Sequence, residues 1–229
     1  MCFSAEASFA GGIIISSIGI ATIRETHKPS QLIFACIPLF FGVQQIAEGF
    51  LWLSLPYQEY INVQKIATYI FLLMAEVFWP VMVPIAVLYM EENKKRKRIL
   101  WALLVMGISL AMYYTYCFLS FNVTPKIIYY HIQYDNDFPG SMVVLTNIIY
   151  IITTIIPLFV SSIKRTHLLG VLIFLSCLVT AIFFTQNLTS VWCFFAALIS
   201  GVIFWILRDS KRKFHLDKIE LLKKPLTQE

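Results

Sequence analysis

Seven apolar segments, separated by short polar connections, dominate the pattern along the chain. We expect membrane-spanning helices over 7–23, 31–55, 63–90, 99–121, 141–163, 168–186 and 190–207. At 1.5 Å per residue, each crosses or nearly crosses a hydrocarbon core of about 30 Å. The pattern predicts an all-α polytopic membrane protein, with a seven-helix transmembrane domain over 1–207 and a basic cytoplasmic tail over 208–229.

Two carboxylates interrupt these apolar segments. Glu48 lies in the second and Glu76 in the third, four residues before Pro80. A charge in hydrocarbon costs roughly 2.5 to 3.5 kcal/mol on insertion scales, so each carboxylate must face protein, water or a ligand. Helical spacing places Gln44 or Gln45 on one stripe with Glu48 and Trp52. Pro80 is expected to kink its helix, and the backbone groups that it frees need other partners.

Composition and charge exclude an ordinary soluble domain and set a direction across the membrane. Hydrophobic residues make up 59% of the chain and charged residues 14%, against about 45–50% and 25% in soluble domains. The net charge of +5 does not indicate nucleic-acid binding, because the basic residues lie between apolar segments. Alternate connections and the tail hold sixteen of the eighteen Lys and Arg residues. The positive-inside rule therefore predicts an external N-terminus and a cytoplasmic C-terminus.

This orientation gathers polar residues toward the outer half of the protein. Tyr113 lies near the outer end of the fourth segment, and Asn147 and Tyr150 near that of the fifth. The long connection 122–140 is expected to form a loop on the same side. We therefore predict an outward-facing cavity with Glu48 at its wall, Glu76 at its floor and the loop as its lid. The predicted ligand-binding residues are Gln44, Gln45, Trp52, Tyr113, Asn147 and Tyr150.

A metal site is a further hypothesis. Cys2 and His131 are both predicted to be external, and thiolate, imidazole and carboxylate are all zinc ligands. With Glu48 they would make a ligand set, although their spacing matches no metal motif. The simpler interpretation is that Glu48 and the glutamines bond neighbouring helices, and that Glu76 serves backbone groups freed by Pro80. The run EENKKRKR (91–98) is interpreted as a solvated cytoplasmic loop, with contact to anionic lipids as the alternative.

Three stretches resemble a known family. The opening MCFSAEASF, the segment PLFFGVQQIAEGFLW and the later WP are similar to an uncharacterised bacterial family of multi-pass membrane proteins whose members begin Met-Cys-Phe-Ser-Ala. The resemblance implies an integral protein of the bacterial plasma membrane, and it implies no particular activity. Size and topology are also similar to the alkaline-ceramidase and progestin-receptor-like membrane hydrolases, but the predicted helices lack the histidine set with which those proteins bind zinc.

Three functions are consistent with these features. The first is a membrane-embedded enzyme acting on a lipid or small molecule, with Glu48 as general base and Glu76 in support. The second is a proton-coupled transporter or conduit in which the two carboxylates relay protons. The third is a non-catalytic sensor or assembly factor whose basic tail binds a partner or anionic lipid.

Overall fold

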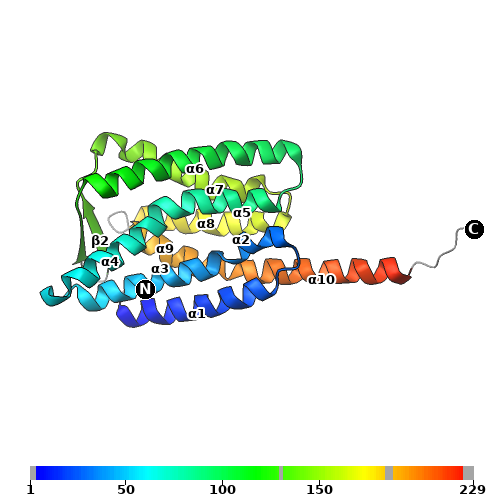
Figure 1. Ribbon diagram of the computed structural model, residues 1–229, viewed down its shortest axis with the longest axis horizontal. Coiled ribbons are helices and arrows are strands. Elements are labelled where there is room, and N and C mark those ends of the chain that lie inside the picture. Colours follow the sequence, from blue (N-terminus) through cyan, green and yellow to red (C-terminus); the bar gives the residue numbers. More distant parts are fainter. Residues whose placement is uncertain (1–3, 129–130, 184–187, 224–229) are drawn as a thin grey trace, which may run out of the picture.

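The computed structural model describes residues 4–128, 131–183 and 188–223, with all side chains among them except those of residues 213 and 215–223. In these residues, seven helical stretches are long and apolar enough to cross a membrane, and they lie side by side as a bundle (Figure 1). They cover Ala5–Arg24, Pro29–Ser54, Gln58–Met90, Lys94–Ser120, Gly140–Val160, Lys164–Phe183 and Leu188–Arg212. The predicted all-α fold with seven spans is confirmed, and the boundaries differ only near the ends of the spans.

Several spans consist of more than one helix. The helices are α1 (Ala5–Arg24), α2 (Leu32–Ala35), α3 (Ile37–Ser54), α4 (Ile61–Leu72), the π-helix η3 (Leu73–Phe78), α5 (Trp79–Met90), α6 (Lys94–Ser120), α7 (Val143–Val160), α8 (Lys164–Phe183), α9 (Leu188–Ser200) and α10 (Val202–Lys223). Short 3₁₀ turns begin the second, third and fifth spans at Pro29–Gln31, Gln58–Tyr60 and Gly140–Met142. The expected boundary at residue 208 falls inside α10, which projects beyond the bundle (Figure 1).

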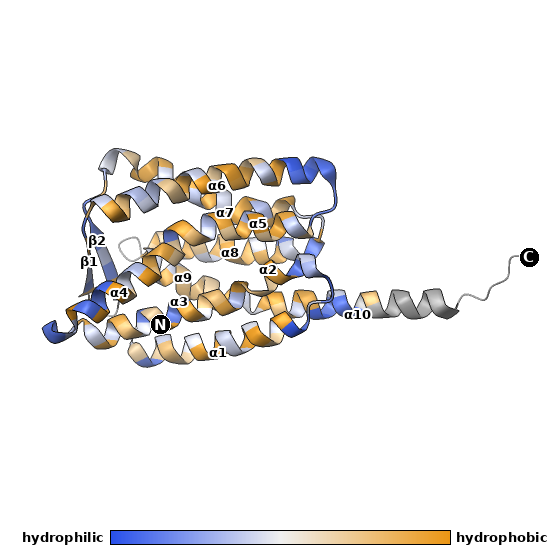
Figure 2. Cartoon of the chain, in the orientation of Figure 1, coloured by the Kyte–Doolittle hydropathy of each residue, from blue (hydrophilic) through white to orange (hydrophobic). Residues whose placement is uncertain are grey.

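Hydrophilic residues gather at the two ends of the bundle, with a mostly hydrophobic band between them (Figure 2). We call one end the hairpin end, because it carries two β-strands and the turn Gln58–Tyr60. The other is the basic end, formed by the connections at 25–28, 91–93 and 161–163, the start of α6 and the projecting part of α10. Polar caps on an apolar band are what a bilayer requires. Which end faces the cytoplasm stays a prediction.

The connection between α6 and α7 is not the irregular loop that we expected. It contains strands β1 (Val123–Ile128) and β2 (His131–Asn136), paired antiparallel from Val123 opposite Asn136 to Ile128 opposite His131. Its β-branched residues favour extended backbone. Ile132 is fully buried against Leu51 and Ala67, so the hairpin is packed onto the ends of α3 and α4.

The basic run is also more ordered than expected. Helix α6 begins at Lys94, so Lys94–Arg98 form its first turns and are not a loop. The side-chain oxygen of Asn93 caps the helix by accepting hydrogen bonds from the backbone N–H groups of Lys95 (2.9 Å) and Arg96 (3.3 Å). Asparagine is a favoured N-cap residue. It marks the start of a helix in a run that its charges led us to interpret as a loop.

Helices α1 and α3 approach closely because glycines face each other between them. A side-chain carbon on Gly12 would lie 3.0 Å from the Gly42 carbonyl oxygen, and one on Gly42 would lie 2.9 Å from that of Gly12. Small residues permit such backbone contact between membrane helices. This contact fixes α3, which carries Glu48, against α1.

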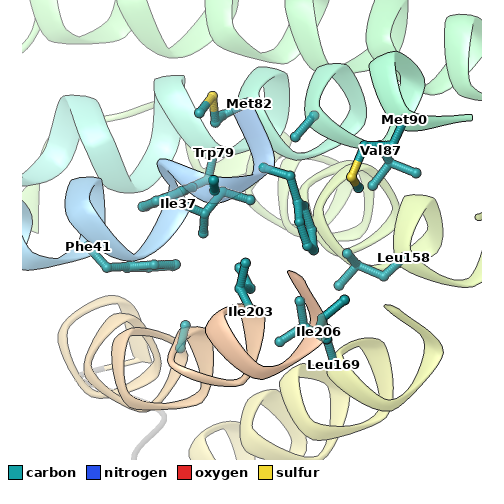
Figure 3. Packing of buried hydrophobic residues seen from close by; sticks show 14 of the residues in the cluster. Ile37, Phe41, Trp79, Met82, Val87, Met90, Leu158, Leu169, Ile203 and Ile206 are labelled. Atoms are coloured by element: carbon teal, nitrogen blue, oxygen red, sulfur yellow. The ribbon is translucent and has the colours of Figure 1, made fainter. Parts of the chain in front are cut away.

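The largest hydrophobic cluster lies in the basic half of the bundle. Figure 3 shows side chains from five helices turned toward one another: Ile37 and Phe41 of α3, Trp79 and Met82 of α5, Leu158 of α7, Leu169 of α8, and Ile203 and Ile206 of α10. The Phe41 and Trp79 rings stack with centroids 3.8 Å apart. The cluster surrounds a small cavity that belongs to the candidate site.

Candidate ligand-binding site

Glu76 lies on the π-helix η3, and Pro80 explains why the helix widens there. Pro80 has no N–H group, and in a regular α-helix its ring would collide with the Glu76 carbonyl four residues earlier. In the structure, the Trp79 N–H donates to the Met74 carbonyl, five residues earlier. Single π-turns inside helices are frequent at functional sites. The wider turn leaves the Ala75 carbonyl without the Trp79 donor that an α-helix would give it.

Tyr150 supplies the missing donor. Its hydroxyl donates a hydrogen bond of 2.5 Å to the Ala75 carbonyl oxygen. Backbone groups inside a membrane protein must be satisfied within the protein, and the expectation that Pro80 would create such a need is confirmed. The bond fixes α7 against η3 directly beside Glu76.

A pocket of about 280 Å³ opens beside Glu76 toward the hairpin end. We call it the outer pocket; its lining residues are Glu76, Tyr113, Tyr114, Asn136, Phe138, Pro139, Val143, Thr146, Asn147, Leu188 and Thr189. Glu76 is the one acidic or basic residue among them. Its oxygen Oε2 is buried and has no hydrogen-bond partner among the described residues. Asn136 ends β2 and Phe138 and Pro139 come after it, so this connection supplies part of the pocket lining, and its role as a lid stays a prediction.

Two smaller spaces continue from the outer pocket into the bundle. The inner pocket, about 40 Å³, shares Glu76, Tyr114 and Asn147 with it and is also lined by Tyr150, Trp192 and Cys193. The core cavity has a volume of about 60 Å³. It shares Tyr150, Trp192 and Cys193 with the inner pocket, and its other lining residues are largely apolar. Six of its lining residues are labelled in Figure 3: Ile37, Phe41, Trp79, Leu158, Leu169 and Ile203.

Glu48 occupies a helix contact in place of the expected cavity wall. It is fully buried on α3, and the Ser190 hydroxyl of α9 donates to its oxygen Oε1. Glu48 does not line the outer pocket, the inner pocket or the core cavity. Of the two carboxylates, Glu76 alone therefore borders these spaces, and a catalytic role for either residue stays a prediction.

The other stripe residues of α3 lie apart from the pocket as well. The Gln44 oxygen Oε1 accepts a hydrogen bond of 2.9 Å from Trp79 Nε1. Gln45 is 1% exposed, and neither atom of its amide has a hydrogen-bond partner among the described residues. Trp52 is half-buried and packs against the cluster formed by Leu51, Ala67 and Ile132. Gln44, Gln45 and Trp52 line none of the three spaces.

The predicted metal ligands are only partly described. Cys2 lies outside the described residues, and His131 begins β2, where burial lowers the pKa of its imidazole. No three His, Cys, Asp or Glu residues of the described chain lie close enough to hold a metal ion. Nearby Asp135 accepts hydrogen bonds of 2.8 Å from both Lys126 and Gln133. A zinc site stays a prediction that depends on Cys2.

Comparison with known proteins gives a family and no activity. A family model described as "Family of unknown function (DUF6629)" matches residues 1–217. The chain belongs to the DUF6629 family. No curated protein matches it, and no solved structure does. The match covers all seven spans of this DUF6629 chain, so both carboxylates and all three spaces lie within the region that defines the family.

The outer and inner pockets of this DUF6629 chain combine predicted and unpredicted residues. Tyr113, Asn147 and Tyr150 were predicted together with Glu76, and the structure brings all four to these pockets. Tyr114 was missed, although it lines the outer pocket together with its neighbour Tyr113. Trp192 was not among the predicted site residues; it is only 7% exposed, and its Nε1 has no hydrogen-bond partner among the described residues.

Proposed function

We propose that this protein binds a lipid or small molecule in the outer pocket and that Glu76 holds the polar part of the ligand. One observation carries the proposal: Glu76 Oε2 is buried beside the pocket without a hydrogen-bond partner among the described residues. Leaving a buried polar group unpaired costs roughly 1 to 3 kcal/mol, and more for a charge. A ligand that donates a hydrogen bond or carries positive charge would remove this cost.

The reaction that this arrangement supports best is proton abstraction by Glu76 in a membrane-embedded enzyme. A general base must come within hydrogen-bond reach of the proton that it removes, and Glu76 borders both the outer and the inner pocket. Asn147 and Tyr114 line the same two pockets and would orient the ligand. Glu48, which accepts a hydrogen bond from Ser190, would support α3 and α9 at a distance from the chemistry.

A proton-coupled conduit has less support. A relay through the bundle needs titratable or polar steps along its length. Beyond the inner pocket, the space that continues toward the basic end is the core cavity, and no Asp, Glu, His, Lys or Arg is among its described lining residues.

The test is whether a ligand copurifies in a Glu76-dependent way. We would purify the wild type, Glu76→Gln and the control Glu59→Gln, an exposed glutamate at the same end, and measure bound small molecules and lipids by mass spectrometry. The wild type and Glu59→Gln should carry the same ligand near one per chain, and Glu76→Gln at least tenfold less. Equal ligand content in all three proteins would contradict the proposal. Conversion of the returned ligand by the wild type alone would identify an enzyme and not a sensor.

A further inference from the structure

The outer pocket combines one acidic side chain with several aromatic rings. Tyr113, Tyr114 and Phe138 line it beside Glu76. The Tyr113 and Tyr114 ring centroids lie 5.6 Å apart, and those of Tyr114 and Phe138 lie 6.5 Å apart. No Lys, Arg or His is among its described lining residues. Aromatic faces attract organic cations, and a carboxylate adds direct charge attraction. This end of the site therefore favours a positively charged group, above all an alkylated ammonium.

The deeper spaces favour hydrocarbon. The core cavity is lined by Ile, Leu, Phe and Trp side chains, with few polar groups, and apolar cavities of this kind stay dry. A group the size of a water molecule needs roughly 10 to 15 Å³ of cavity volume. The inner pocket and the core cavity, about 40 and 60 Å³, therefore have room for about seven to ten methylene-sized groups. Tyr150, Trp192 and Cys193 line both spaces and form the waist between them.

We propose that the ligand is a single-chain amphiphile with a cationic ammonium head. The head lies between Glu76 and the aromatic rings of the outer pocket, and the alkyl chain passes the waist at Trp192 into the core cavity. This proposal rests on the ligand-binding function proposed above and names its substrate class. The head could come from a free alkylammonium ion or from a choline-headed lipid with one chain, which share the same cationic group.

Binding of a chain-length series tests the proposal. We would place the full-length protein in lipid nanodiscs and titrate butyl-, hexyl- and octyltrimethylammonium by calorimetry, with empty nanodiscs as the control for partitioning. Alkyl sulfonates of the same lengths test the sign of the head charge. Octylphosphocholine tests the lipid source. Affinity for the cations should rise roughly tenfold for every two added methylenes, because each buried methylene contributes about 0.8 kcal/mol, and the sulfonates should not bind.

Two variants separate the head from the tail. Glu76→Gln should weaken all three cations about tenfold or more. Ala196→Leu, which adds bulk inside the core cavity, should weaken octyltrimethylammonium at least tenfold and leave the butyl compound unchanged. Ser200→Leu, at another lining position, is the alternative should Ala196→Leu not fold.

The outcomes distinguish this proposal from the one that it rests on. Glu76-dependent binding without any chain-length dependence would overturn the amphiphile and leave the ligand-binding function standing. Sulfonates binding as well as the cations would overturn the cationic head. If none of these probes binds and the purified protein still carries a Glu76-dependent ligand, the substrate class alone is wrong. Octylphosphocholine binding as tightly as octyltrimethylammonium supports the proposal with a lipid source, and its failure to bind supports it with a free ammonium ion.

Discussion

Glu91 shows at the scale of a single residue how a carboxylate can hold two connections together. Its Oε1 accepts hydrogen bonds from the backbone N–H groups of Glu92 (3.1 Å) and Asn93 (2.9 Å), and its Oε2 accepts one from that of Ser162 (2.6 Å). The residue is 2% exposed. Burial alone would raise the pKa of Glu91, but the hydrogen bonds from Asn93, Ser162 and Glu92 outweigh it and hold this pKa below its usual range.

Replacing Glu91 with glutamine should destabilise the protein, because the amide NH₂ would face backbone donors. We expect a loss of about 1 to 3 kcal/mol, measured by thermal unfolding in detergent. Since the folded-state pKa is lowered, the stabilisation is present above the unfolded value of about 4.3 and is lost as pH falls through the lower folded value. The difference between wild type and Glu91→Gln should therefore shrink below about pH 4. Glu92→Gln, whose side chain is 87% exposed, should unfold like the wild type at every pH. Equal losses for both variants would contradict this role.

The sequence could identify a functional residue where its own segment was sufficient to show that it needs a partner. Glu76 was identified because a carboxylate inside an apolar segment requires a partner, whatever the fold. Glu91 was missed because it begins a charged run that reads as solvent-exposed, and its partner Ser162 lies 71 positions along the chain. Glu48 was placed at a cavity wall on the same reasoning as Glu76. The partner that the structure gives it, Ser190, could not be known before the helices were packed.

At the scale of elements, the π-helix η3 makes the bond from Tyr150 to the Ala75 carbonyl necessary. Tyr150→Phe should leave that carbonyl without the side-chain donor that pairs it inside the membrane span. We expect a loss of about 1 to 3 kcal/mol in thermal unfolding. Tyr116→Phe, on a tyrosine that is 61% exposed, is the matched control and should be neutral. A Tyr150→Phe protein as stable as the control would show that the bond contributes nothing.

Elements were predictable where the bilayer dictates them. Each span follows from hydropathy, because backbone in hydrocarbon must be helical and its side chains apolar. The hairpin 123–136 was missed because strand pairing joins residues apart in the sequence and its Tyr, Asn and Asp residues also suit a loop. Pro80 correctly predicted that the helix of the third span would be distorted. A proline in the sequence does not by itself distinguish a kink from a π-turn.

At the scale of the whole molecule, the two ends of the bundle differ in charge. Lys28, Arg96, Arg165 and Lys211 come from four different connections or helix ends, and the structure gathers them at the basic end. Lys65 and Lys126 are the only Lys or Arg residues of the sequence outside 24–28, 94–98, 164–165 and 208–224. By the positive-inside rule, the basic end should face the cytoplasm and the hairpin end the exterior.

Accessibility of two matched cysteines should reveal this orientation. We would introduce Glu59→Cys at the hairpin end or Glu92→Cys at the basic end, both exposed, into a chain whose own five cysteines are replaced. A membrane-impermeant maleimide should label Glu59→Cys in intact cells and Glu92→Cys only after permeabilisation. The reverse pattern would contradict the predicted topology. The result also decides where the ligand comes from: the outer pocket is bordered by Asn136, Phe138 and Pro139 beside the hairpin, so an external hairpin end requires a ligand that arrives from outside the cell or from the outer leaflet.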